Sequence, residues 1–145
     1  MSVLVAGFSL PRALVGALES GQWRMPSDVG LLEAAFKDKP MNPRAYSLQG
    51  IVSETEQWRA ESDPEVLEWY LGSPSDLVPP GDISQQESVM IGDLGPDRPF
   101  ALDYRRSRDG PSVVYLTSHS GWLEVAPNIE TFLSMLGLVG EPSAR

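Results

Sequence analysis

The chain has 145 residues, a length at which one domain buries about two thirds of the surface that its unfolded chain exposes. It carries a net charge of −9 and contains no cysteine, which excludes disulfides, thiolate metal sites and cysteine nucleophiles. The lack of thiols fits a reducing compartment, and the apolar N-terminus has no basic signal segment and is interrupted at Pro11 before it could span a membrane. We therefore expect a single cytoplasmic domain over residues 1–145.

Two helices are expected near the N-terminus. From residue 10 to residue 20, Leu14 and Leu18 lie four positions apart on one face, and Gly21 is suited to end the helix. The second helix is expected to begin at Ser27, whose hydroxyl can cap the first turn, and to end before Pro40. Its apolar residues are Leu31, Leu32, Ala35 and Phe36.

The middle of the chain predicts a strand, a helix and a loop. Apolar and small residues alternate from Tyr46 to Val52, which is typical of a strand. Asp63 followed by a proline is a helix start signal, and Gly72 is placed to end that helix. Residues 73–84 are rich in proline, serine, glycine and aspartate, so we expect a surface loop there.

A sheet is expected in the second half of the chain. Strand patterns occur at 88–94, 99–106, 112–117 and 122–126, and the short turns between them favour antiparallel pairing. A last helix follows Asn128, with its apolar stripe formed by Ile129, Phe132, Leu133 and Leu136. The predicted fold class is α+β, with an antiparallel sheet of about four to six strands packed with N-terminal helices and a C-terminal helix.

The strand at 99–106 has two different faces. One face should meet the core and be covered by the last helix, and it comprises Phe100, Leu102 and Tyr104. The other face should meet solvent or a partner, and it comprises Ala101, Asp103 and Arg105. Arg105, Arg106 and Arg108 are expected in a solvated hairpin loop, paired locally with the flanking aspartates.

The negative charge is concentrated in the centre of the chain. Residues 54–97 hold eleven acids and one base, whereas the remaining residues hold nine acids and ten bases. Such a stretch repels nucleic acid and steers a basic protein toward it. Trp58 and Trp69 lie among these carboxylates, a composition typical of binding hot spots. The alternatives are that either ring is the buried face of a short helix and that the single acids serve solubility. The candidate partner-binding residues are Glu54, Glu56, Trp58, Glu61, Glu65, Glu68, Trp69, Asp76 and Asp82.

Few residues suggest catalysis. His119 is the only histidine and is expected in a polar turn, so no triad and no two-imidazole metal site can form. Asp93, Asp97 and Asp103 are close in sequence and two of them could form an acid–base pair or hold a hard cation. The favoured interpretation is that they are turn formers, so no catalytic, cofactor-binding or metal-binding residue is assigned.

Four motifs follow one another between Val89 and Leu138: Ile91-Gly92-Asp93, Ala101-Leu102-Asp103-Tyr104-Arg105, Val113-Val114-Tyr115 and the segment from Trp122 to Leu138. Their order resembles the SUKH superfamily, in its SMI/KNR-like bacterial branch. This resemblance implies an α+β domain without cofactor that acts by binding proteins, often an immunity protein that neutralises a nuclease or other toxin. Two alternatives remain open: a regulatory adaptor with a cellular partner, and a carboxylate-dependent hydrolase with a concave pocket.

Overall fold

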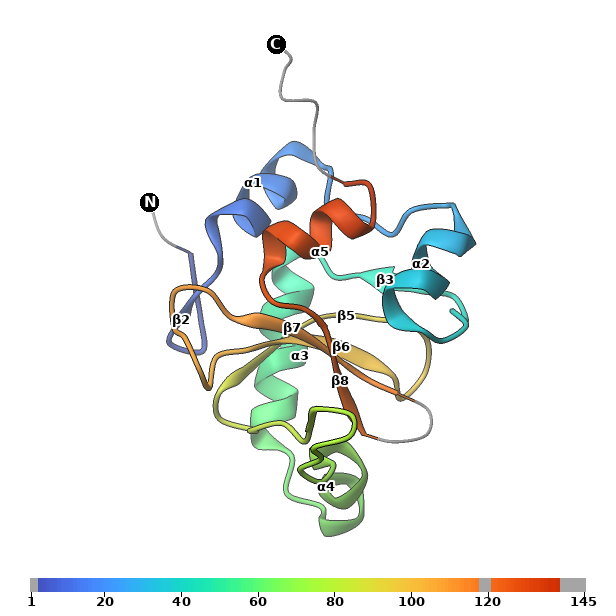
Figure 1. Cartoon of the computed structure of the whole chain (residues 1–145). Helices are drawn as coiled ribbons and strands as arrows, with labels where there is room; N and C mark the ends of the chain where they lie inside the picture. Colours follow the sequence, from blue (N-terminus) through green and yellow to red (C-terminus); the bar gives the residue numbers. More distant parts are fainter. Residues whose placement is uncertain (1–2, 118–120, 139–145) are drawn as a thin grey trace.

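The computed structural model describes residues 3–117 and 121–138, and it confirms the α+β class. The expected turn at His119 lies outside these residues. Figure 1 shows a central sheet with helices on both sides. The helices are α1 (Arg12–Ser20), α2 (Val29–Phe36), α3 (Leu48–Ala60), α4 (Pro64–Leu71) and α5 (Ile129–Met135).

The main sheet is antiparallel and has six strands within the described residues. In spatial order they are β3 (Arg44–Ala45), β5 (Ser88–Asp93), β6 (Pro99–Asp103), β7 (Ser112–Leu116), β8 (Trp122–Ala126) and β4 (Pro80–Gly81). The four strands predicted in the second half of the chain are therefore confirmed, and β3 and β4 extend the sheet at its two edges. A separate two-stranded sheet pairs β1 (Leu4–Val5) with β2 (Phe8–Ser9).

One face of the main sheet carries the larger core. Phe100, Leu102 and Tyr104 are buried there in one cluster with the α5 residues Phe132, Leu133 and Leu136, as predicted. The ring of Phe36 lies 5.1 Å from Phe100 and 5.8 Å from Phe132, measured between centroids. Helices α1, α2 and α5 lie together on this side of the sheet (Figure 1).

The opposite face is also covered by the chain itself, whereas the sequence predicted that it meets solvent or a partner. Ala101 is fully buried in a second cluster with Trp58 and Trp122, against which half-buried residues of α4 pack. Asp103 is only 8% exposed and receives hydrogen bonds from the Arg105 guanidinium. The alternation of apolar and charged residues predicted solvent on this face, but a carboxylate can be buried when a neighbouring guanidinium is paired with it.

The predicted strand at 46–52 is wrong, because α3 begins in this segment. Ser47 caps the helix by accepting a hydrogen bond from the Gly50 amide, and Ile51, Thr55 and Trp58 then form its buried face. The Thr55 hydroxyl accepts a hydrogen bond from the Met90 amide at 3.0 Å. Strand β3 pairs only with the last two residues of β5, and α3 covers the rest of this edge. The Met90 amide, which has no strand partner there, is satisfied by the Thr55 hydroxyl.

Two smaller differences between the structure and the sequence prediction concern the start of α2 and residues 73–84. The cap of α2 is Asp28 rather than Ser27, since the Asp28 carboxylate accepts from the Gly30 amide. Residues 73–84 are not wholly a surface loop, because Gly81 is buried and pairs with Trp122 of β8. Across residues 3–117 and 121–138, no helix has the length and apolar character needed to cross a membrane.

Candidate functional site

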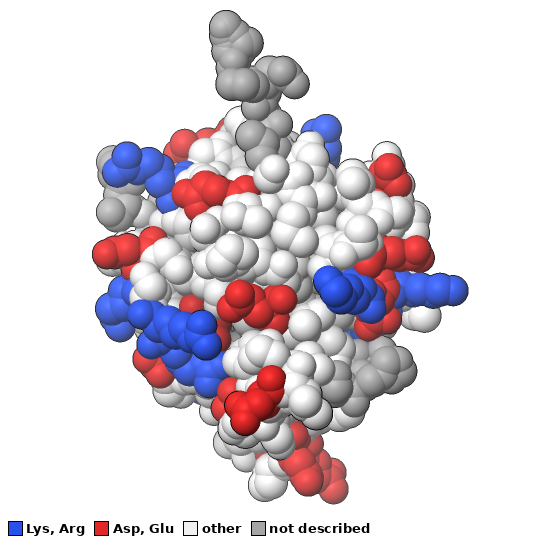
Figure 2. Space-filling view, viewed as in Figure 1, with Lys and Arg blue, Asp and Glu red and all other residues white. Residues whose placement is uncertain are grey.

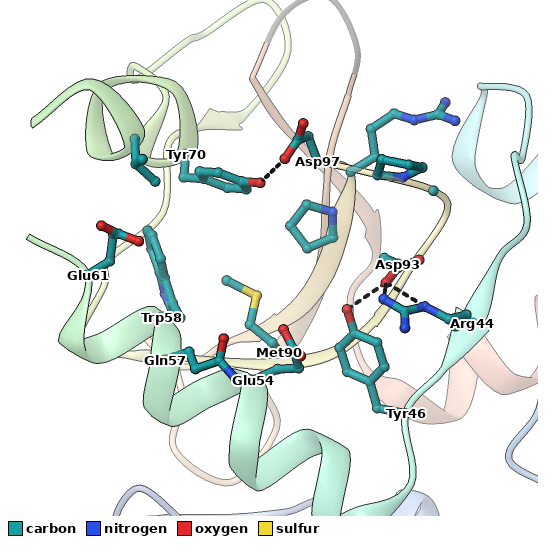
Figure 3. Close-up of a pocket in the computed structure, with 15 residues that line it drawn as sticks. Arg44, Tyr46, Glu54, Gln57, Trp58, Glu61, Tyr70, Met90, Asp93 and Asp97 are labelled. Carbon is teal, nitrogen blue, oxygen red and sulfur yellow. Dashed lines mark hydrogen bonds and ion pairs between the residues drawn. The ribbon is translucent and has the colours of Figure 1, made fainter. Parts of the chain in front are cut away.

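A groove of about 410 Å³ opens between α3, α4 and the turn that joins β5 to β6 (Figure 3). Its lining combines aromatic rings with carboxylates and includes two arginines. The lining residues used below are Arg44, Tyr46, Glu54, Gln57, Trp58, Glu61, Val66, Tyr70, Met90, Asp93, Asp97 and Arg98.

Helix α3 supplies one wall. Glu54 and Trp58 are four residues apart on one face of this helix, and Glu61 is the residue that follows its last turn. All three border the groove. Trp58 is only 7% exposed, and its indole Nε1–H donates to the Ser88 hydroxyl at 2.8 Å. The structure therefore selects the alternative that the sequence left open for Trp58: the ring is part of the core and forms the floor of the groove.

Helix α4 supplies the opposite wall. Asp63 caps it by accepting from the Glu65 amide, and the Tyr70 side chain then points across the groove. The Tyr70 hydroxyl donates to the Asp97 carboxylate at 2.5 Å. Asp97 adopts a left-handed backbone conformation, with φ of 60°, which aspartate tolerates better than most residues. Burial and then the Asp97 carboxylate raise the pKa of Tyr70, so the phenol remains a donor.

A bulge in β5 directs Asp93 into the groove. The register against β6 shifts between Met90 and Gly92, so one extra residue, Ile91, interrupts the alternation. Without this shift, Asp93 would lie on the same face as Ile91, which is in the larger core. With it, Met90 and Asp93 both line the groove.

Asp93 is held by two donors from the segment before α3. Arg44 donates to its Oδ2 through Nε at 3.1 Å and through a terminal nitrogen at 2.5 Å. The Tyr46 hydroxyl donates to the same oxygen at 2.7 Å. Burial and the hydrogen bond to Asp93 raise the pKa of Tyr46, so this phenol also stays protonated. The charge of Asp93 is therefore compensated within the chain.

The groove has a surplus of negative charge after such pairs are formed. Arg98 lies 3.5 Å from the Asp38 carboxylate, and Arg44 is paired with Asp93. Within the part of the chain that the structure describes, no lysine or arginine forms an ion pair with Glu54 or Glu61. The negative charge of these two carboxylates also contributes to the raised pKa of Tyr70 on the opposite wall of the groove.

The nine candidate residues from the sequence divide into three groups. Glu54, Trp58 and Glu61 line the groove. Asp82 does not line it, and is ion-paired with Arg105 at 3.0 Å. The exposed members are Glu56, Glu65, Glu68, Trp69 and Asp76. Trp69 is 50% exposed, so it is the only one of the two proposed anchor tryptophans that projects into solvent.

The three carboxylates considered for catalysis are not brought together as a set. Asp93 and Asp97 line the same groove, which is part of what the hydrolase hypothesis requires. Asp103 pairs with Ser88 at the other end of the β5–β6 hairpin. Each carboxylate already accepts hydrogen bonds from a tyrosine or an arginine. Among the described residues, no group of three or more histidine, cysteine, aspartate or glutamate side chains is placed to hold a metal ion.

Several groove residues were not predicted from the sequence. Arg44, Tyr46 and Tyr70 are far from one another or from their carboxylate partners along the chain, so no local motif reveals them. The spacing of Glu54, Trp58 and Glu61 is the signal that could indicate one wall of the groove. The strand pattern at 46–52 obscures it, because that pattern hides the start of α3.

No protein-family model, curated protein or solved structure matches this chain.

Proposed function

We propose that this chain is a non-enzymatic protein-binding domain that receives a basic protein partner on the surface formed by α3 and α4, here called the acidic face. The observation that carries this proposal is a group of exposed carboxylates around a half-exposed tryptophan, Trp69, with no ion pair to any described lysine or arginine. On the face seen in Figure 2, acidic but no basic side chains are visible at the end of the molecule where α4 lies.

In such a face the carboxylates affect the rate of association, and the aromatic side chain affects the binding free energy. Exposed carboxylates raise the association rate of a basic partner, and salt weakens that effect because the Debye length shortens to about 10 Å at 0.1 M. Trp69 supplies apolar area that a partner can bury, which is typical of the few residues that dominate binding energy. Glu65 precedes Trp69 by one helical turn, so the ring lies beside a carboxylate.

The specific role that we propose is that of an immunity protein which neutralises a toxin. Its support is the motif resemblance to the SUKH superfamily together with an acidic face that complements a basic nuclease domain. A regulatory adaptor would use the same face for a cellular partner, and the two roles differ in whether the partner is toxic when it is produced alone.

The test begins with the gene immediately upstream. Its C-terminal domain is produced with and without this chain, and cell growth is measured. We expect growth to be lost without the chain and restored with it, and purified components to bind with an association rate that falls as salt rises. Growth unaffected by the domain alone would favour the adaptor role.

A matched pair of variants tests the acidic face. Replacing Glu54, Glu56 and Glu61 together by glutamine should slow association, whereas replacing the exposed Glu19, Glu33 and Glu130 of the opposite side should change it little. Both variants alter the net charge equally. Equal slowing by the two variants, binding that is indifferent to salt, or a complex that leaves α3 and α4 in solvent would each overturn the proposal.

A further inference from the structure

The groove contains an arginine of the chain itself at one end. The Arg44 guanidinium lies 5.4 Å from the centroid of the Tyr46 ring and makes two hydrogen bonds to the Asp93 carboxylate. This end of the groove therefore shows a guanidinium held between an aromatic ring and a carboxylate, a favourable combination of cation–π contact and charge-assisted hydrogen bonds.

The other end has the same components without the cation. The rings of Trp58 and Tyr70 lie 6.1 Å apart at an interplanar angle of 55°, and the Glu61 carboxylate lies beside them (Figure 3). Glu54 borders the space from α3, and Asp97 borders it from the β5–β6 turn. No described lysine or arginine is ion-paired with Glu54, Glu61 or Asp97. Glu54 is near enough to Arg44 to contribute to the raised pKa of that guanidinium. The uncompensated negative charge over the aromatic floor is therefore chiefly that of Glu61 and Asp97.

We propose that this end of the groove, bounded by Trp58, Tyr70, Glu54 and Glu61, binds an arginine side chain of the basic partner. This inference rests on the proposed function and specifies which chemistry the partner presents. A guanidinium fits because it is planar, packs on aromatic rings and offers five donors to carboxylates on more than one side. An acidic or phosphorylated side chain would be repelled by the same carboxylates.

The size of the groove agrees with this occupant. A volume of about 410 Å³ is within the range of sites that bind small ligands, so the side chain can enter with part of its flanking backbone. Removing water from a guanidinium also costs less than removing it from an ammonium, because arginine is more weakly hydrated than lysine.

The first experiment uses a short peptide as the probe. N-acetyl-Gly-Arg-Gly-amide is titrated into the isotope-labelled protein, and the indole N–H signal of Trp58 is followed by NMR. We expect a saturable shift of this signal with a dissociation constant on the order of 1 mM, while the amides of α1 and α5 stay unchanged. The peptide with citrulline in place of arginine should cause no such shift, because citrulline is neutral. An equal shift with citrulline, or with a lysine peptide, would overturn the arginine assignment.

The second experiment uses two double variants with the same change in charge. Glu54→Gln with Glu61→Gln alters the groove, and Glu56→Gln with Glu68→Gln alters exposed carboxylates of α3 and α4 that do not line it. We expect the groove pair to weaken peptide binding by about tenfold or more, and the control pair by less than about twofold. Glutamine can still accept the hydrogen bond that the Asp63 amide donates to Glu61, so the local structure is preserved.

Binding of the whole partner separates the failure of this inference from that of the proposed function. If both double variants slow partner association equally and the peptide leaves the Trp58 signal unmoved, the groove proposal is wrong and the acidic face remains. If neither double variant affects partner binding, both proposals are wrong.

Discussion

The two faces of the main sheet differ in what covers them. The face under α1, α2 and α5 is packed with aromatic rings, among them Trp23, Phe36, Phe100 and Phe132, whose centroids lie 5.1 to 6.4 Å apart in the measured pairs. The face toward α4 has a smaller apolar cluster bordered by the charged groove.

This difference separates stability from binding within one small domain. Tight apolar packing provides most of the free energy of folding, and cavities there are costly. Half-exposed carboxylates and one projecting tryptophan contribute little to folding but present charge and apolar area to a partner. Substitutions on the packed face should therefore lower the free energy of unfolding, whereas substitutions on the acidic face should weaken binding and leave stability nearly unchanged.

The largest loss of stability is expected from Phe132→Ala. Phe132 is fully buried against Phe36, Phe100 and Trp23, so its truncation leaves a cavity in the larger core. We expect the free energy of unfolding to fall by about 3 to 5 kcal/mol, measured by urea denaturation. A loss below about 1 kcal/mol would contradict the assignment of this face as the main source of stability.

Gly92→Ala tests the bulge that directs Asp93 into the groove. A Cβ at this position would lie 2.6 Å from the Arg44 carbonyl oxygen and closer still to the Phe100 ring, so β3 or β6 would have to move. We expect a loss of about 1 to 3 kcal/mol in the free energy of unfolding.

The control for this change is Gly16→Ala in α1. A Cβ there meets nothing within 4 Å, and alanine is the better helix former, so stability should rise by about 0.5 to 1 kcal/mol. Two variants with equal stability would show that the space around Gly92 is not restricted.

Tyr104→Phe tests the packed face through its pH dependence. The Tyr104 hydroxyl is buried and donates to the Ser9 carbonyl at 2.8 Å, and burial raises its pKa above the ordinary value of about 10. Below pH 10 both states are protonated, and the wild type should be about 1 kcal/mol more stable than the variant. Above pH 10 the unfolded phenol loses its proton while the folded one keeps it, so the wild type loses stability as the pH rises.

The stability advantage of the wild type over Tyr104→Phe should therefore fall by about 1.4 kcal/mol for each pH unit above 10, so that it is present at pH 9 and is lost or slightly reversed at pH 11. Urea denaturation at the two pH values measures it. The other three tyrosines are present in both proteins and cancel from the comparison. If the free energies of unfolding of the two proteins changed with pH in parallel, the Tyr104 hydroxyl would have the same pKa in the folded and the unfolded state.

Much of the fold could be predicted because its signals are local. Asn128 and the apolar stripe that follows predict α5, and the turns between the four long strands fix their antiparallel pairing. The start of α3 was missed because Tyr46, Leu48, Gly50 and Val52 alternate like a strand, whereas the helix is decided by the Ser47 cap and by packing on β5.

The candidate site could be predicted only in part. The composition of residues 54–97 indicates the charge, but the partners of its carboxylates come from distant segments, as Arg44 does for Asp93. The bulge at Ile91 is also invisible in the sequence, although it decides which face Asp93 occupies. Long-range pairing and register shifts depend on the folded backbone, and local patterns do not specify them.

The smallest effect on stability is expected from Trp69→Ala on the acidic face. Trp69 is 50% exposed, so its removal should change the free energy of unfolding by no more than about 0.5 kcal/mol. The same change at Trp58 removes a buried ring and the donor to Ser88, and should cost about 3 to 5 kcal/mol.

Binding should show a clear effect of Trp69→Ala in spite of the small change in stability. If Trp69 is the anchor that the partner buries, the variant dissociates faster and loses about 2 kcal/mol or more of binding free energy, measured from dissociation rates with the cognate partner. The association rate should stay close to that of the wild type, because the carboxylates that steer the partner remain. A variant that folds normally and dissociates at the wild-type rate would show that the carboxylates act without an aromatic anchor at this position.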